Sequence, residues 1–159
     1  MDTNSAKDND LTFLIHDVAH LMRTRFDQQA RAWGMTRAQC IILIHLHFHP
    51  GITQTEMAAH CEIEPITVAR LVDRLEAGGY VERRSDPSDR RINRLHLLPA
   101  AEPILAKIKA SREASITALI GDMSPEAIAI AVKALQRMKI KLTTGCMARG
   151  QTLPEDKTA

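Results

Sequence analysis

Five arginines gather within a twelve-residue stretch of the sequence, 83–94. They are Arg83, Arg84, Arg90, Arg91 and Arg94. Only Asp86 and Asp89 oppose them, so five positive and two negative charges give the stretch a local charge of +3. Clustered guanidinium groups are suited to binding phosphate. The alternative is a solvated hairpin tip on an ordinary small α+β protein, because charge runs often form only the soluble face of a fold.

The segment before these arginines predicts an amphipathic helix from Pro65 to the Gly78-Gly79 stop. Its apolar residues stand at i, i+3, i+4 and i+7 and predict one buried stripe. They are Val68, Leu71, Val72 and Leu75. Ile66, Ala69, Arg70 and Asp73 fall on the opposite face, with Thr67 and Arg74 on its flank. A helix with such a polar face fits the DNA major groove, which is about 12 Å wide.

Further elements must position this helix and the arginines. Apolar residues at three- and four-residue steps predict a long helix from Asp10 to Trp33. Thr36-Arg-Ala-Gln39 and Thr53-Gln-Thr-Glu56 both have the form of a capping box, and each predicts a helix start. The first of these helices contains the apolar run 40–46 and is expected to be buried, and the second is expected to end near Cys61.

Two strand-like runs, 80–84 and 93–98, flank a polar turn and predict a β-hairpin whose tip carries the arginines. A long helix is expected to open at Pro99 or Pro103. Ser124-Pro125-Glu126 predicts the start of a last helix through Leu142. The expected fold is mainly α with a small β-hairpin (α+β): a winged helix-turn-helix flanked by long helices.

Composition limits the classes of protein to consider. The chain has 159 residues, a net charge of +2 and 45% hydrophobic residues, as expected of one globular domain. It has no apolar run of about 18 residues and a polar start, so we expect a cytoplasmic protein without membrane partners. Its three cysteines have no CxxC spacing, which argues against a disulfide framework or a zinc ribbon.

Four segments together resemble the MarR/SlyA family of winged helix-turn-helix transcriptional regulators, over the span from about Leu11 to Leu142. They are Met35–Gln39 (MTRAQ), His49–Gln54 (HPGITQ), Leu71–Arg83 (LVDRLEAGGYVER) and Asp86–Arg91 (DPSDRR). The resemblance implies a homodimer that binds a pseudo-palindromic operator in double-stranded DNA, as a repressor released by a small ligand. An activator or anti-silencer of the same fold is the alternative.

By position, the resemblance also implies the DNA contacts. The matching residues are Thr53, Gln54, Pro65, Ile66, Thr67, Arg70, Arg74, Arg90 and Arg91. Arg70 is the expected base reader, because its planar fork can donate two parallel hydrogen bonds to guanine. Arg90 and Arg91 match the wing arginines that enter the minor groove. Asp89 is expected to brace the wing by pairing with an arginine, since a carboxylate there would repel phosphate.

The resemblance divides the chain into functional segments. Residues 10–34 and 99–144 are expected to form dimerisation helices, residues 35–98 the DNA-binding lobe, residues 1–9 a disordered start and residues 145–159 a flexible tail. The candidates for the dimer seam are Ile128, Val132, Leu135, Met138 and Leu142, with an intramolecular core role as the alternative for each.

Three kinds of switch are open. The preferred one is an organic effector such as an aromatic acid, with Arg23, Arg25, Phe26, Trp33 and His45 as candidate lining residues. No cofactor is expected. A thiol sensor is the second, but Cys40 falls in a buried run, Cys61 at a helix end and Cys146 near the tail.

Metal sensing is the third switch. His16 and His20, like His45 and His49, are i,i+4 pairs that bring two imidazoles to one helix face. Unliganded surface or helix-end histidines are the preferred interpretation, and no metal is expected.

Two other classes of protein compete with a regulator. An enzyme is not expected, because the sequence has no Gly-rich phosphate loop, no GxSxG elbow and no HExxH motif. A helical protein–protein adaptor is disfavoured by the hairpin and its clustered arginines. Salt-dependent binding to duplex DNA separates the regulator from both.

Overall fold

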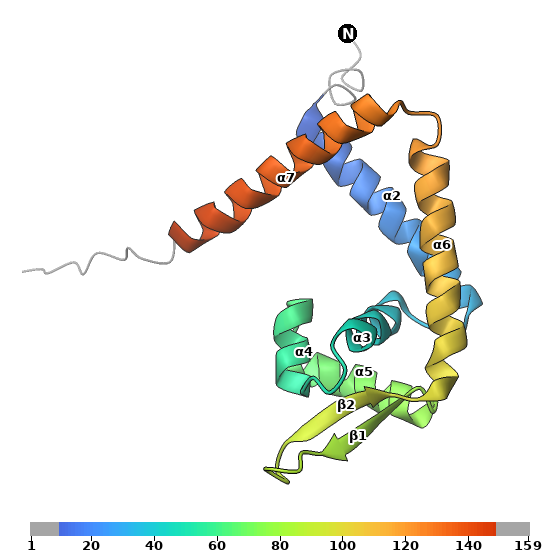
Figure 1. Cartoon of the computed structure of the whole chain (residues 1–159), viewed down its shortest axis with the longest axis vertical. Helices are drawn as coiled ribbons and strands as arrows, with labels where there is room; N and C mark the ends of the chain where they lie inside the picture. Colours follow the sequence, from blue (N-terminus) through green and yellow to red (C-terminus); the bar gives the residue numbers. More distant parts are fainter. Residues whose placement is uncertain (1–9, 149–159) are drawn as a thin grey trace, which may run out of the picture. The chain divides into compact units, whose positions relative to one another are not determined.

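The computed structural model describes residues 10–148, with the side chains of 145–148 left out. The segments 1–9 and 149–159, for which we expected disorder and a flexible tail, lie outside the described residues. Figure 1 shows a mostly helical chain with one two-stranded antiparallel sheet, so the predicted fold class is confirmed. The elements in order are α2 (Leu11–Ala32), α3 (Arg37–Phe48), α4 (Gln54–Cys61), α5 (Pro65–Ala77), β1 (Val81–Ser85), β2 (Asn93–Leu97), the 3-10 turn η1 (Pro99–Ala101), α6 (Glu102–Ile120) and α7 (Pro125–Ala148).

Side-chain caps set the starts of the first three helices. The Asp10 carboxylate accepts from the backbone N–H of Thr12 at 2.8 Å and so begins α2. Thr36 with Gln39 and Thr53 with Glu56 form the two predicted capping boxes at the starts of α3 and α4. Each box satisfies backbone N–H groups that have no partner within the helix, which is why these helices begin where the sequence predicts.

One hydrophobic core unites α3, α4, α5, the hairpin and the first half of α6. The predicted stripe of α5 is fully or almost fully buried, and α3 contributes an entire buried face. The largest fully buried side chains are Ile42, Leu43, Leu46, Met57, Leu75 and Leu95. This core holds α5 and the hairpin as parts of one lobe.

The hairpin pairs Val81 with Leu97, Arg83 with Leu95 and Ser85 with Asn93. In this register Val81 and Leu95 are buried, whereas the ends of the strands near Ser85 and Asn93 are exposed. The base of the hairpin therefore packs onto the core, and its tip is left in solvent.

The chain divides into two compact units, residues 1–112 and 113–159. The first contains α2 to η1 and most of α6, and the second contains the end of α6 and all of α7. Helix α7 continues six residues past the expected end at Leu142, so residues 145–148, assigned to the tail from the sequence, are helical. Thr143 donates its hydroxyl to the Ile140 carbonyl at 2.9 Å, a local bond that the helical conformation accommodates.

Among the described residues, no single helix has both the length and the apolar character needed to cross a membrane. Only the pair Pro99–Ile120 and Pro125–Thr144, bent by 110°, meets those criteria jointly.

Candidate nucleic-acid interface

Helix α5 exposes the polar face that its sequence predicts. Ile66, Thr67, Arg70 and Arg74 are exposed, while Val68 is completely buried. Within the described part of the chain, no hydrogen bond or ion pair engages the guanidinium of Arg70 or Arg74. Both cations are therefore available to an external acceptor.

Arg83 has a different role from its neighbours in the basic segment. Its guanidinium lies between two carboxylates of α5, donating to Asp73 at 2.6 Å and also to Glu76. The backbone N–H of Arg83 donates to Glu76 at 3.1 Å. These bonds fasten the first strand of the hairpin to α5, so Arg83 positions the wing instead of offering charge to a ligand.

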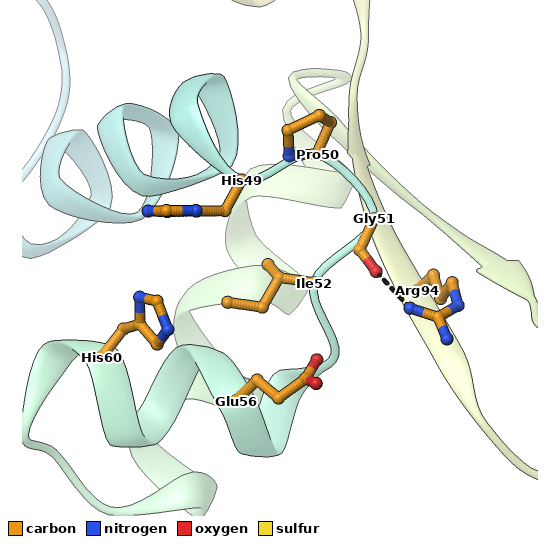
Figure 2. Close-up of a pocket in the computed structure, with 7 residues that line it drawn as sticks. All are labelled: His49, Pro50, Gly51, Ile52, Glu56, His60 and Arg94. Carbon is orange, nitrogen blue, oxygen red and sulfur yellow. Dashed lines mark hydrogen bonds between the residues drawn. The ribbon is translucent and has the colours of Figure 1, made fainter.

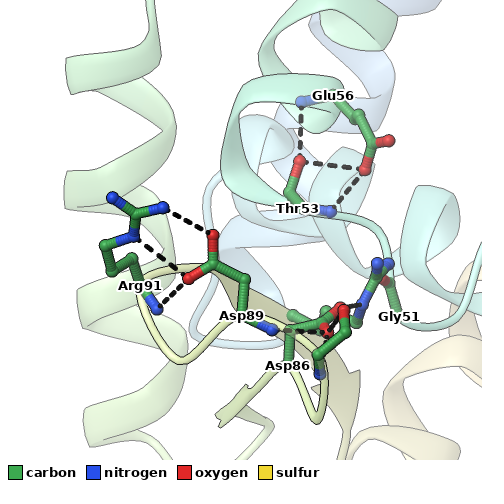
Figure 3. A network of polar contacts seen from close by, with 8 residues as sticks. Gly51, Thr53, Glu56, Asp86, Asp89 and Arg91 are labelled. Atoms are coloured by element: carbon green, nitrogen blue, oxygen red, sulfur yellow. Dashed lines mark hydrogen bonds and ion pairs between the residues drawn. The ribbon is translucent and has the colours of Figure 1, made fainter.

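Asp86 is the buried polar centre of the wing, with 5% of its surface exposed. Its carboxylate accepts from the turn that follows, from the N–H of Ser88 at 2.7 Å and from that of Asp89 at 3.3 Å. Figure 3 shows Asp86 beside Asp89. The Asp86 carboxylate also accepts from the Ser88 hydroxyl and from Nε of Arg94. The bonds from Ser88, followed by that from Arg94, hold the pKa of Asp86 far below its ordinary value.

Arg94 extends this network to the start of α4. Its Nη1 donates to the carbonyl of Gly51 at 2.9 Å, and its backbone forms an isolated bridge with Thr53. Gly51 lies in the turn before α4 with φ of +79°, a conformation that favours glycine. The wing and the turn between α3 and α4 are thus connected through one arginine.

At the tip of the wing, Asp89 and Arg91 form a two-bonded pair (Figure 3). The Arg91 guanidinium donates to both carboxylate oxygens, at 3.1 and 3.2 Å, and its backbone N–H donates at 3.0 Å. This arrangement has the geometry expected for bracing, and the Arg91 bonds lower the pKa of Asp89. The side chain of Arg91 is still 91% exposed, and Arg90 is exposed with no partner among the described residues.

The hydroxyl of Thr53, a candidate DNA contact, takes part in the α4 capping box (Figure 3). It donates to a Glu56 carboxylate oxygen at 2.9 Å and accepts from the Glu56 N–H at 3.2 Å. The Thr53 backbone N–H donates to the same carboxylate at 2.8 Å, and this bond, followed by that from the hydroxyl, lowers the pKa of Glu56. Gln54 is partly exposed at the first position of α4.

Three histidines come together beside the turn between α3 and α4. Each of His45, His49 and His60 offers a ring nitrogen, and these atoms all lie within 4.8 Å of one another. Burial, followed by the two neighbouring imidazoles, lowers the pKa of His45. Figure 2 shows His49 and His60 at a shallow pocket of about 350 Å³. Its other lining residues are Pro50, Gly51, Ile52, Glu56 and Arg94.

Sequence spacing identified only part of this cluster. His45 and His49 were an expected pair, whereas His60 stands eleven positions after His49 and on the next helix. The second expected pair, His16 and His20, is exposed on α2 and gains no third histidine, cysteine or carboxylate as a partner within the described residues.

The candidate sensor thiols differ in burial. Cys40 is completely buried, which raises its pKa to about 11, so the thiol is protonated at neutral pH. Burial also raises the pKa of the half-buried Cys61. The side chain of Cys146 lies outside the described residues.

The predicted effector residues fall into separate groups. Phe26 and Trp33 pack edge to face with ring centroids 6.2 Å apart, against the core. Arg23 and Arg25 are exposed on α2, and His45 belongs to the histidine cluster. A pocket made by all five residues stays a prediction.

The candidate seam residues on α7 are half-buried or exposed. Ile128 and Met138 are half-buried, and Val132, Leu135 and Leu142 are between 47% and 76% exposed. Helix α2 likewise exposes large apolar side chains. They include Leu11, Leu14, Val18, Leu21 and Met22.

Known proteins resemble this chain in sequence. Residues 33–92 match the model of the MarR family, a range that runs from the end of α2 to the tip of the wing. The chain is 26% identical over 130 residues to YsmB of Bacillus subtilis, described as an uncharacterized HTH-type transcriptional regulator, and the match covers 82% of this chain and 89% of YsmB.

Solved structures agree over nearly the whole chain. The crystal structure of MarR is 27% identical with a TM-score of 0.72, covering 94% of this chain and 97% of MarR. S. aureus MepR in a complex with DNA is 21% identical with a TM-score of 0.72, covering 85% of this chain and 98% of MepR, and it shares the fold. The core, the wing and the matched segment 33–92 all agree with the MarR family of winged helix-turn-helix transcriptional regulators, which this chain resembles.

Proposed function

We propose that this protein is a homodimeric repressor that binds a pseudo-palindromic operator and is released by a small organic effector. The observation that carries the proposal is the pairing, in one lobe, of a recognition helix whose arginines have no partner among the described residues with a wing whose tip presents Arg90 and Arg91. In this arrangement α5 enters the major groove and the wing tip reaches the adjacent minor groove.

The contacts divide into two kinds. Arg70 reads a base edge, with Thr67 and Arg74 in support, because an arginine fork matches guanine O6 and N7. The remaining residues contact the DNA backbone or determine how closely the protein approaches it. They are Thr53, Gln54, Pro65, Ile66, Arg90 and Arg91. The DNA complex of the structural neighbour MepR supports this class of ligand.

Dimerisation follows from the exposed apolar faces of α2 and α7, which a monomer would leave in water. We assign residues 10–34 and 99–144 to the dimer and residues 35–98 to DNA binding. A two-fold protein reads half-sites whose centres are about one helical turn, roughly 10–10.5 base pairs, apart or multiples of it.

Selection of binding sites from a random duplex pool tests this proposal. Enriched sequences are expected to be two-fold symmetric with half-sites at that spacing. Enrichment of a single unrepeated half-site would contradict the dimeric mode, and the absence of enrichment over input would contradict sequence-specific recognition. A protein that acts on chromosomal DNA in this way works in the cytoplasm and needs no catalytic residue.

The direction of regulation needs a separate measurement. In a reporter placed behind the selected operator, expression is expected to rise when the protein is removed. A fall would support the activator or anti-silencer alternative.

The effector is proposed to be an aromatic acid or a related compound. The edge-to-face pair of Phe26 and Trp33 offers an apolar wall, and Arg23 or Arg25 offers a cation for a carboxylate. Benzoate-type acids are expected to raise the Tm of the protein and weaken operator binding. A panel that changes neither quantity would remove this class of effector.

A further inference from the structure

The cluster of His45, His49 and His60 has the composition and position of a metal centre. His45 lies in the last turn of α3, His49 caps that helix, and His60 lies in the last turn of α4. The ring centroids of His49 and His60 are 4.9 Å apart, and those of His45 and His60 are 6.0 Å apart. The ends of two helices therefore bring three imidazoles together, and two of them, those of His49 and His60, line the shallow pocket.

No competing bond holds these rings. Among the described residues, none of the three imidazoles takes part in a hydrogen bond or an ion pair, and the partly exposed pocket leaves His49 and His60 room to rotate. In a tetrahedral site with Zn–N bonds of about 2.0–2.1 Å, ligand nitrogens lie about 3.4 Å apart. Ring rotations that shorten separations of up to 4.8 Å by about 1.5 Å would give this geometry.

The charges around the cluster are compatible with a bound cation. Arg94 lines the same pocket, but its guanidinium is bound by Asp86 and the Gly51 carbonyl. Glu56 also lines the pocket, and both of the bonds that its carboxylate accepts from Thr53 are made by one oxygen. The second oxygen adds negative charge beside the proposed ion.

We propose that His45, His49 and His60 bind one divalent cation of the zinc class per chain, with water completing the coordination. Three neutral imidazoles are typical ligands for Zn²⁺ and unsuited to Mg²⁺, which prefers oxygen. The sequence favoured unliganded histidines because spacing alone supplied two ligands, and the third comes from the fold.

The bound ion would join the end of α3 to the end of α4, the first helix of the helix-turn-helix. His49 is also two residues before Gly51, whose carbonyl holds Arg94 of the wing. Fixing this turn would preorganise α4 and the wing before DNA binds and add positive charge near it, and both effects favour the complex. This consequence rests on the proposed function, whereas metal binding itself does not.

The test begins with Zn²⁺ titrated into the full-length protein against a chromogenic chelator. We expect one ion per chain, bound more tightly than micromolar, and no comparable binding of Mg²⁺. His60→Gln is expected to weaken binding by at least about 10-fold, the lower limit of what loss of even an outer-shell partner costs a metal site. His49→Gln is expected to do the same.

Matched controls use histidines outside the cluster. His20→Gln removes one member of the other i,i+4 pair, and His47→Gln removes an exposed histidine of the same helix α3. Both are expected to bind Zn²⁺ as the wild type does. The Tm of each variant without metal verifies that it folds. A wild type with no site tighter than micromolar, or a His60→Gln variant with unchanged affinity, would overturn the metal site.

A second arm measures DNA binding with and without Zn²⁺. The ion is expected to tighten operator binding of the wild type by roughly 5- to 150-fold and to leave His60→Gln unchanged. By linkage, DNA must raise the affinity for Zn²⁺ by the same factor. Zinc binding with no change in operator affinity would overturn the regulatory consequence. A protein that binds zinc but no DNA in any condition would refute the proposed function and leave the metal site established.

Discussion

At the residue scale, the basic segment contains arginines with two distinct roles. Arg83, Arg84 and Arg94 pair with carboxylates of α5, β1 and the wing turn, although Arg84 remains exposed. Arg90 and Arg91 extend from the tip with most of their donors free. The local charge of +3 counted in the sequence therefore overstates what is available to DNA, and Arg83 and Arg94 instead connect the wing to the rest of the lobe.

Substituting Arg70 by alanine is expected to weaken operator binding by roughly 1–3 kcal/mol and to relax specificity at one base pair. The reason is that Arg70 is exposed and has no partner within the described residues, so its loss removes a DNA contact without disturbing the lobe. Anisotropy with operators altered one base at a time measures both effects. Arg112→Ala, an exposed arginine of α6, serves as the control, and equal losses in the two variants would refute the assignment.

Substituting Asp86 by asparagine is expected to lower the Tm at pH 7 and to weaken DNA binding. The folded-state pKa of Asp86 lies below the value of about 3.9 for an unfolded aspartate. Its carboxylate therefore stabilises the fold fully above that pH, and the contribution is lost as the pH falls through the folded-state pKa. The Tm difference between variant and wild type should shrink below about pH 4. A pH-independent difference, or the same profile for exposed Asp122→Asn, would contradict this role.

The sequence predicted the residues of the wing better than their roles. Asp89 was expected to brace the wing, and the structure places it against Arg91. Asp86 was not singled out, although Asp-Pro-Ser is a sequence in which an aspartate commonly bonds the backbone two residues later. His60 could not be joined to His45 and His49 from spacing, because the packing of α4 on α3 sets their separation.

At the element scale, α5 packs one face into the core and exposes the other, which is the proposed DNA interface. Its inward residues are buried to at least 92%, whereas Ile66 on the outer face is 61% exposed. The sequence predicted this helix, its bounds and its two faces because apolar periodicity and the proline and glycine at its ends act locally. The end of α7 was misjudged because Thr143, Thr144 and Gly145, which have low helix propensity, lie within the helix and do not end it.

Two side-chain truncations distinguish the role of the buried face of α5 from that of its exposed face. Leu75→Ala is expected to lower the free energy of unfolding by roughly 2–5 kcal/mol, since the leucine is completely buried. Ile66→Ala should change it by no more than about 0.5 kcal/mol and yet weaken DNA binding. Urea unfolding and operator anisotropy measure the two quantities. A large stability loss in Ile66→Ala would contradict its outward position.

At the scale of the whole molecule, the account requires a second copy of the chain. The apolar faces of α2 and α7 are partly uncovered in one chain, and α7 contributes no fully buried residue among those whose side chains are described. Sequence periodicity can mark such a face but cannot tell whether the same chain or a partner covers it. That distinction depends on the tertiary packing of the long helices.

Leu135→Glu on α7 is expected to shift the protein from dimer to monomer and to abolish high-affinity operator binding, because a carboxylate on the seam would be desolvated without a partner. Light scattering after gel filtration measures the mass. Lys133→Glu introduces the same group on the opposite face of the helix and should remain dimeric. A dimeric Leu135→Glu variant would exclude this seam.

The most direct test of the central claim is fluorescence anisotropy of the full-length protein with duplexes tiled across the region upstream of its own gene, against a shuffled duplex, over a range of salt concentrations. The account predicts nanomolar, sequence-selective binding that weakens as salt rises. Arg90→Ala and Arg91→Ala should each reduce the slope of log affinity against log salt by about 1. Absence of even salt-sensitive, non-specific binding would contradict the account.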